Sequence, residues 1–300
     1  MTGLWPGRIQ CVVMITFDLD GASGMLRREP SVADRPSVMS MGDFGPEVGA
    51  PRILDLLAAH SVPATFFVPG WVAERHPGAV KAITRGGHEV AHHGYMHEAP
   101  ATLPSREEEA AVLDRGSDAL EKVTGKRALG YRSPAWDVSK HTLGLLADRG
   151  FVYDSSLMGH DVPYFADVAT GRMLDRSGLK MAGAEGRRVV ELPVHWSLDD
   201  APYYPFNPAI GRMGTLASPQ AALDTWVWEF DMAYKHGGAF MLTMHPYISG
   251  HWSRVNGLRR LLRHIQSHRS AEFMRCIDVA QGWTASGLRP IAARRRAARK

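Results

Sequence analysis

Cysteine is nearly absent, since Cys11 and Cys276 are the only two in 300 residues. No two cysteines are separated by two residues, so zinc sites built on paired thiolates and dithiol redox motifs are excluded. A disulfide framework is excluded for the same reason. We expect two buried free thiols in a protein of a reducing compartment.

Long hydrophobic runs are also missing. No stretch approaches the roughly 18 apolar residues of a membrane-spanning helix. The first apolar run, Cys11–Phe17, is short, and Met1–Gln10 before it carries one arginine, which argues against a secretory signal. We therefore expect a cytoplasmic protein that does not act in a membrane.

The body of the chain lacks an excess of either charge. The net charge is +4, but residues 294–300 carry five positive charges, so removing them leaves −1. The net positive charge therefore comes from the last seven residues, and no nucleic-acid-binding face is expected on the rest of the chain. No repeat or low-complexity linker divides the rest. The sequence therefore predicts a single domain over residues 1–290 and a basic tail over residues 291–300.

Short apolar runs alternate with amphipathic segments along the chain. We expect β-strands at Val12–Phe17, Ala64–Val68, Glu89–His92, Ala128–Arg132, Phe151–Ser155, Val189–Val194, Ala239–His245 and Phe273–Ile277. We expect helices at Val48–Ala59, Ser105–Val123, Ser139–Asp148, Pro219–Tyr234 and Arg254–Ser267, the second opened by a capping box of Ser105 and Glu108. Such alternation is typical of a parallel sheet. Eight strands over this length predict an α/β fold, a closed or nearly closed (β/α) barrel.

Three connections that follow strands are long, whereas those that follow helices are short. The long ones are Gly21–Gly45, Leu157–Arg188 and Ser197–Leu216. Long loops without secondary structure in a compact domain are usually binding loops or lids. All three leave the carboxyl ends of strands, which is where barrels keep their active sites.

Polar residues gather at the same strand ends. They are Asp18, Asp20, His92, His93, His97, Arg132, Asp154, His195, Asp199, Asp200 and His245. A barrel brings these ends to one rim, which favours a metal-dependent hydrolase. Asp18 and Asp20 alternate along an extended strand, so both face one side, and one can bind a metal while the other acts as a base.

Histidines in the segment Gly87–His97 have the spacing of a metal-ligand pair. His93 and His97 are four residues apart, and so are His88 and His92. Four residues are about one helical turn, so either pair can present two imidazole nitrogens to one ion. The spacing alone does not choose between the two pairs.

Four segments together resemble the successive motifs of the polysaccharide deacetylases, also called the NodB homology domain or carbohydrate esterase family four. They are Thr16–Gly21, Gly87–His97, Arg132–Trp136 and Leu242–Pro246. Order and spacing both fit, and the likeness spans roughly residues 10–280. It implies a distorted (β/α)7-8 barrel. It also implies a metal-dependent hydrolase of non-peptide amide bonds that removes N-acetyl groups from an amino sugar or a peptidoglycan-type substrate.

The resemblance also implies a role for each residue that matches a motif. Asp20, His93 and His97 hold a divalent ion, expected to be zinc, which leaves His88 structural. Asp18 is the general base, and Arg132 pairs with it. His245 protonates the departing nitrogen, oriented by Asp199 in preference to Asp200. Trp136, Tyr203 and Tyr204 are expected to contact the substrate.

Other features narrow or challenge this interpretation. Leu19 separates the two aspartates, and Gly94 stands where the family usually has Ser or Thr. Phe44–Arg52 and Leu198–Pro202 resemble an intracellular branch that includes peptidoglycan deacetylase-like proteins, cyclic imide hydrolases and allantoinase-type enzymes, many of them tetramers. A small-molecule amidase acting on cyclic imides or ureides is therefore an alternative, and a homotetramer is expected.

Two further alternatives come from other classes of protein. Phe17–Gly21 alone also resembles the haloacid-dehalogenase phosphatases, which need a doubly wound sheet and leave the histidine cluster unexplained. An inactive carbohydrate-binding protein on the same scaffold is the other alternative. Against it, every position with an expected catalytic role is filled.

Overall fold

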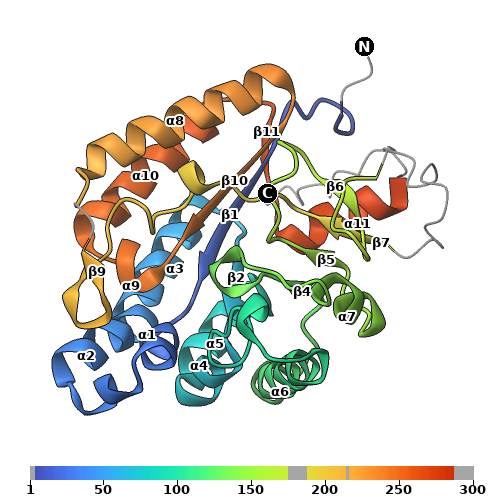
Figure 1. The fold of residues 1–300 in the computed structure, drawn as a ribbon. Coiled ribbons are helices and arrows are strands. Elements are labelled where there is room, and N and C mark those ends of the chain that lie inside the picture. Colours follow the sequence, from blue (N-terminus) through green and yellow to red (C-terminus); the bar gives the residue numbers. More distant parts are fainter. Residues whose placement is uncertain (1–3, 175–187, 214–215, 287–300) are drawn as a thin grey trace.

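The computed structural model describes residues 4–174, 188–213 and 216–286, and one curled β-sheet runs through the middle of them (Figure 1). Its strands follow one another in space as β10 (Ala239–Met244), β1 (Cys11–Asp18), β2 (Thr65–Val68), β3 (Glu89–His92), β4 (Gly130–Tyr131), β5 (Tyr153–Asp154), β7 (Arg188–Glu191) and β6 (Tyr164–Asp167). A short strand, β11 (Ala271–Phe273), pairs with the first residues of β1.

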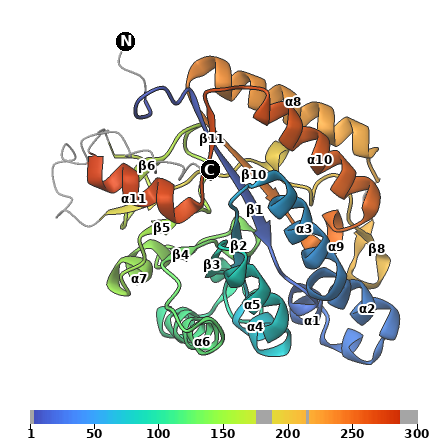
Figure 2. The same ribbon diagram turned by 180° about the vertical axis from the view of Figure 1, so that it is seen from behind.

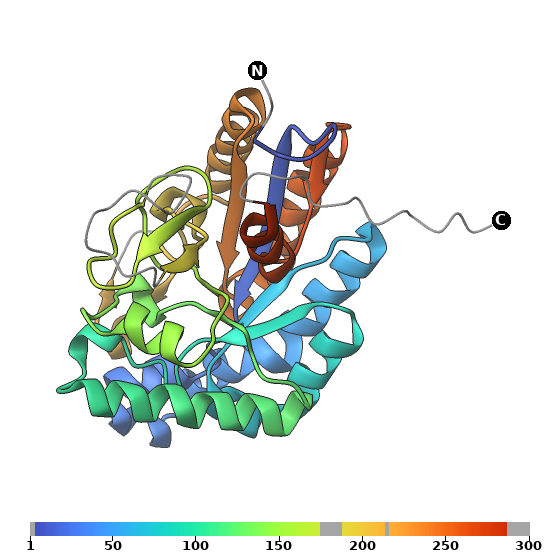
Figure 3. The same cartoon turned by 90° about the vertical axis from the view of Figure 1, so that its right-hand side faces the viewer.

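All of these strand pairs are parallel except that of β6 with β7. An isolated parallel bridge between Asp199 and Thr243 joins the segment after β7 to β10, on the side of β10 that β1 leaves open. The sheet thus curls back towards its first edge, as Figure 3 shows from the side. This confirms the prediction of a distorted barrel, and it excludes the doubly wound sheet of the phosphatase alternative.

Helices surround the sheet, as the views in Figures 1 and 2 show. They are α1 (Ser23–Arg28), α2 (Pro36–Phe44), α3 (Ala50–His60), α4 (Gly70–Arg75), α5 (Pro77–Arg85), α6 (Arg106–Thr124), α7 (Thr142–Asp148), α8 (Pro219–His236), α9 (Pro246–Ser249), α10 (Trp252–Gln266) and α11 (Cys276–Ser286). The predicted capping of α6 is present, since the amide of Glu108 donates to Ser105 Oγ over 3.2 Å. No helix among the described residues is long and apolar enough to cross a membrane.

Strand β1 sets the position of the site, because all eight of its residues are buried and they alternate between two faces. Val13, Ile15 and Phe17 belong to the larger apolar cluster, together with residues of α3, α8 and α10. Val12 and Met14 belong to a second cluster inside the curl. The same alternation directs Asp18, at the end of the strand, towards the inside.

Several elements differ from the sequence prediction. The last strand was expected at Phe273–Ile277, but β11 ends at Phe273 and α11 starts at Cys276. The amides of Cys276 and Ile277 donate to Thr65 Oγ1 and to the carboxylate of Glu89, both over 2.9 Å. These side chains of β2 and β3 accept hydrogen bonds from free backbone amides in the first turn of α11. The apolar run is so short that its pattern fits a strand as well as a helix.

The three long connections are more ordered than expected. Gly21–Gly45 contains α1 and α2, and a π-helical turn at Gly45–Gly49 joins α2 to α3. Leu157–Arg188 contains the antiparallel strand β6, and its residues 175–187 lie outside the described residues. Ser197–Leu216 contains the two-stranded hairpin of β8 (Phe206–Asn207) and β9 (Arg212–Met213).

Both cysteines are free and buried, as predicted. Burial raises the pKa of each thiol to about 12, so neither is a reactive thiolate at neutral pH. The basic tail lies outside the described residues.

Candidate active site

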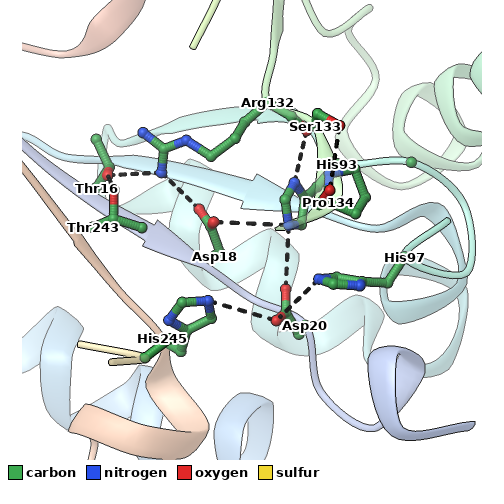
Figure 4. A network of polar contacts seen from close by, with 12 residues as sticks. Thr16, Asp18, Asp20, His93, His97, Arg132, Ser133, Pro134, Thr243 and His245 are labelled. Carbon is green, nitrogen blue, oxygen red and sulfur yellow. Dashed lines mark hydrogen bonds and ion pairs between the residues drawn. The ribbon is translucent and has the colours of Figure 1, made fainter. Parts of the chain in front are cut away.

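The side chains expected at the strand ends come together at one rim of the barrel (Figure 4). Asp18 and Asp20 come from the end of β1, His93 and His97 from the segment after β3, and Arg132 and His245 from the ends of β4 and β10. Apart from His97, which is about one-fifth exposed, they are buried. The predicted convergence of distant carboxylates and imidazoles is therefore present.

Asp20, His93 and His97 present three ligand atoms to one point. Asp20 Oδ1 lies 3.5 Å from His93 Nε2, and Asp20 Oδ2 lies 3.4 Å from His97 Nε2. Ligands bound to zinc at about 2.0–2.2 Å in a tetrahedron are separated from one another by about 3.3 Å. The spacing is thus too long for good hydrogen bonds and right for a shared ion.

The backbone after β3 is bent to achieve this. Gly94 has φ +73° and His97 has φ +61°, both in the left-handed region, where a residue other than glycine is strained. Glu98 closes the turn, because its Oε2 accepts from the amides of Tyr95 and Met96 over 3.0 and 2.7 Å. Glycine at position 94, instead of the usual Ser or Thr, suits this conformation.

The choice between the two histidine pairs follows from their hydrogen bonds. His93 Nδ1–H donates to the carbonyl of Arg132 over 2.7 Å, which leaves Nε2 free to bind a metal. His92 instead donates from Nε2 to the carbonyl of Leu113 and accepts from the amide of Gly94. Burial lowers the pKa of His92 to about 4, so it is a neutral core residue. His88 accepts from the amide of Ala64, again a structural contact.

Asp20 gives a direct test of whether a cation fits. Its Oδ1 is buried and has no hydrogen-bond partner among the described residues. Burial opposes ionisation of Asp20, but the neighbouring His97 and His93 outweigh it and hold the pKa of the carboxyl well below its usual value. Burial likewise opposes the charged form of His93, yet Asp18 and Asp20 raise its pKa. A buried, ionised carboxylate with an unused oxygen beside two imidazoles suits a divalent ion.

Asp18 is held beside this point by Arg132. Arg132 Nη1 donates to Asp18 Oδ1 over 2.8 Å and to Thr16 Oγ1 over 2.9 Å. The guanidinium is fully buried and lies over the ring of Phe67, 3.9 Å from its centroid. The second oxygen of Asp18, Oδ2, faces His93 Nε2 at 3.7 Å. Asp18 therefore has one oxygen fixed and the other directed at the point that the three ligands share.

Asp200, and not Asp199, is the carboxylate that holds His245. His245 Nδ1–H donates to Asp200 Oδ1 over 2.6 Å, whereas Asp199 Oδ1 is 3.6 Å away and instead accepts from the amide of Ala201. Asp200 Oδ2 also accepts from the amide of His245 and the hydroxyl of Ser249. Both carboxylates lie near His245, but the hydrogen bond that orients its ring goes to Asp200 and not to Asp199, which the sequence had favoured.

The pKa values of His245 and Asp199 are both shifted by this arrangement. Burial lowers the tendency of His245 to be charged, but Asp200 outweighs it and raises the pKa of His245 well above the usual value. Burial raises the pKa of Asp199 to about 7. The other nitrogen of His245, Nε2, lies 3.7 Å from Asp20 Oδ2. This imidazole therefore borders the place that Asp20, His93 and His97 share.

The aromatic residues predicted to contact substrate divide into two groups. Tyr204 is buried in the outer apolar cluster under the guanidinium of Arg254, where it packs within the fold, and its contact with substrate stays a prediction. Tyr203 is half-buried and donates its hydroxyl to the carbonyl of Ser197. The ring of Trp136 lies 4.3 Å from that of Trp196, a residue not predicted at the site, which is 46% exposed.

Three other histidines, His195, His264 and His268, lie outside the rim cluster. His195 bonds locally to Ser197 through Nδ1 and does not join the site. Asp231, His264 and His268 form a second His/Asp cluster outside the rim, but its members are partly exposed and His264 already hydrogen-bonds to Asp231 over 2.6 Å. The rim cluster is the better metal site because its carboxylate is buried and one of its oxygens has no hydrogen-bond partner among the described residues.

Chemically, the rim combines a place for a cation, a fixed carboxylate and a proton-bearing imidazole on one side of a distorted barrel. Such a set suits the attack of water on a carbonyl followed by protonation of a leaving group, which is the work of a hydrolase.

Known proteins share this fold, and several are similar to this chain in sequence. The polysaccharide deacetylase family matches residues 31–153. The peptidoglycan deacetylase of Helicobacter pylori is 30% identical over 283 residues, which is 90% of this chain and 95% of that protein. A crystal structure from Mycobacterium smegmatis, named for the polysaccharide deacetylases, is 39% identical with a TM-score of 0.86 and covers 95% of this chain and 94% of its own.

An allantoinase structure has the same fold at 22% identity, with a TM-score of 0.76 and coverage of 95% of this chain and 94% of its own. The chain belongs to the polysaccharide deacetylase family and is a hydrolase of carbon–nitrogen bonds other than peptide bonds.

Proposed function

We propose that this protein is a metal-dependent deacetylase that removes N-acetyl groups from an amino sugar or a peptidoglycan-type substrate. The observation that carries the proposal is the free oxygen of Asp18. It points to the place shared by Asp20, His93 and His97 while Arg132 holds the other oxygen. The H. pylori relative, named a peptidoglycan deacetylase, supports the substrate class.

Asp20, His93 and His97 are the residues that would hold the metal, and zinc is the proposed ion. Two imidazoles and one carboxylate are a common catalytic zinc set that leaves positions open. When bound, such an ion lowers the pKa of water and polarises a carbonyl oxygen. The carbonyl of Arg132 fixes the orientation of the His93 ring and raises its basicity as a ligand.

Asp18 and His245 divide the proton transfers. Asp18 takes a proton from the attacking water, and the guanidinium of Arg132 pairs with it and keeps it oriented. His245, held protonated by Asp200, gives its proton to the amide nitrogen as the carbon–nitrogen bond breaks. The products are acetate and a free amine. We assign Trp136, with Trp196 beside it, to the wall against which a sugar ring packs.

Asp200→Asn is expected to move the alkaline limb of the pH–rate profile to lower pH. The active form of His245 is the protonated one, so activity is present below its pKa and is lost as pH rises through it. Asp200 raises that pKa, so removing its charge lowers it. We expect kcat/KM to fall about 100-fold near pH 8 and much less near pH 6.

The matched control is Asp199→Asn, which removes the neighbouring carboxylate that makes no hydrogen bond to His245. Its alkaline limb should move less than that of Asp200→Asn. An unchanged limb in Asp200→Asn would show that His245 is not the acid, and equal shifts for the two variants would show that Asp200 is not the carboxylate that sets its pKa.

The function is tested by incubating zinc-loaded protein with N-acetylglucosamine oligomers and peptidoglycan fragments and measuring released acetate. We expect acetate from at least one of these substrates. Succinimide and hydantoin are assayed in parallel, because a cyclic amide opens at the same kind of site. Ring opening without any acetate release would contradict the deacetylase and support the cyclic-imide alternative.

We also propose a cytoplasmic homotetramer. Support comes from the resemblance of Phe44–Arg52 to the intracellular branch of the family. Trp228 and Met232, one turn apart on α8, are 70% and 40% exposed, which suits an interface between copies. Light scattering of the purified protein should give about four times the mass of the chain.

A further inference from the structure

Two carboxyl groups that the reaction does not use lie beneath the rim. Asp154 ends β5 and Glu191 ends β7, and the two residues are direct partners in the parallel ladder. Both are fully buried. Carboxyl groups placed side by side in a dry interior repel strongly when both are ionised, so their hydrogen bonds decide how they coexist.

Each carboxyl has one oxygen that is satisfied and one that is not. Asp154 Oδ1 accepts from the hydroxyl of Ser156 over 2.6 Å. Glu191 Oε1 accepts from the amides of Ser156 and Leu157, both over 2.9 Å. Asp154 Oδ2 and Glu191 Oε2 find no donor among the described residues. One proton placed between these two oxygens satisfies both of them.

The surrounding side chains that the structure describes do not supply a donor or a positive charge to these two oxygens. Arg132 faces Asp154, but its guanidinium nitrogens are used by Asp18, Thr16 and Ser155. Tyr131 and Tyr164 face the pair from β4 and β6, and both remain neutral because burial raises their pKa. No cation among the described residues pairs with either carboxyl.

The pair connects to the rim through Ser156. Its hydroxyl donates to Asp154 and accepts from the amide of Ser133 over 2.8 Å. Ser133 follows Arg132, whose guanidinium also holds Ser155 through Nε to the carbonyl (3.2 Å) and Nη2 to the hydroxyl (3.0 Å). Arg132 in turn orients His93 by its carbonyl and Asp18 by its guanidinium.

We propose that Asp154 and Glu191 share a single proton, and that this pair acts through Ser156 as a positioning site that holds Arg132 in place for Asp18 and His93. The first half is independent of the enzyme's reaction, and the second half rests on the proposed function. Neither carboxyl touches substrate or metal.

The shared proton has a consequence for stability. Burial raises the pKa of Asp154 to about 6, and burial together with the charge of Asp154 raises the pKa of Glu191 well above its usual value. A carboxyl whose pKa is raised by folding binds its proton more tightly in the folded state. The stability it confers is therefore complete below the unfolded pKa and declines as pH rises towards the folded pKa.

Glu191→Gln tests the shared proton. The glutamine oxygen can accept from the two amides, and its NH2 group can donate to Asp154 Oδ2 without needing a proton. We expect the melting temperature of Glu191→Gln, relative to the natural protein, to rise steadily as the pH is raised above about 5. Glu272→Gln, at an exposed glutamate of β11, is the control and should show no trend. Parallel melting profiles for Glu191→Gln and the natural protein would overturn the shared proton.

Ser156→Ala tests the link to the rim. We expect its zinc affinity, measured by competition with a chelator, to weaken about 10-fold, and kcat to fall by a similar factor with KM unchanged. The control is Ser117→Ala, which removes a buried hydroxyl of α6 that has no hydrogen-bond partner among the described residues. If Ser156→Ala lowers only the melting temperature and otherwise matches Ser117→Ala, the positioning role is overturned. If the natural protein itself neither binds zinc nor releases acetate, the proposed function fails, while the melting profiles of Glu191→Gln still decide the shared proton.

Discussion

Asp18→Asn is expected to lower kcat by about 1000-fold or more while leaving the bound metal in place. The amide keeps the size of the carboxyl and its oxygen can still accept from Arg132, so the arginine is not left without a partner. It cannot take a proton from water at neutral pH. Metal content is expected to persist because Asp18 is not among the three proposed ligands Asp20, His93 and His97.

The measurement is kcat for acetate release together with elemental analysis of the same preparation. Asp118→Asn, at an exposed position of α6, is the control and should behave as the natural protein. Normal hydrolysis by Asp18→Asn would show that the base has been assigned to the wrong residue.

His93→Ala is expected to lose both the metal and the activity. The substitution removes one of three ligand atoms, and it leaves the buried Asp20 with fewer compensating groups. It also leaves the carbonyl of Arg132 without the hydrogen bond that His93 Nδ1–H donates to it. We expect metal content to fall from about one ion per chain to background and acetate release to fall below detection.

The adjacent histidine provides the matched comparison. His92 is buried to the same degree, but its nitrogens bond to Leu113 and Gly94 and not to the ligand set. His92→Gln should cost stability of about 1–3 kcal/mol through altered buried hydrogen bonds while keeping the metal. Retention of metal by His93→Ala, or its loss from folded His92→Gln, would reverse the choice between the two histidine pairs.

Much of the fold could be predicted because the strands of a covered parallel sheet are continuous apolar runs. Strand β1 is the clearest case, since all eight of its residues are buried. Strand β6 was missed because it is antiparallel and lies inside a long connection that carried no helix pattern. Helix α11 was missed because its start depends on Thr65 and Glu89, side chains more than 180 residues earlier in the sequence.

The site could be predicted as far as its residues lie at strand ends, since the topology alone brings such ends together. Asp18, Asp20, His93 and His245 are all of this kind. The choice between Asp199 and Asp200 could not be made from the sequence, because two adjacent carboxylates both come near His245 and only the folded geometry shows which of them accepts from its Nδ1–H. The burial of Tyr204 could not be predicted for a similar reason. An aromatic residue in a long loop has the same sequence pattern whether it packs inwards or lines a surface.

Anomalous X-ray diffraction at the zinc absorption edge, from crystals of the zinc-loaded protein, tests the central claim most directly. We predict one strong peak at about 2.0–2.2 Å from a carboxylate oxygen of Asp20, His93 Nε2 and His97 Nε2, with His245 and Asp18 at its edge. A peak only at Asp231, His264 and His268, or none at the rim, would contradict the account.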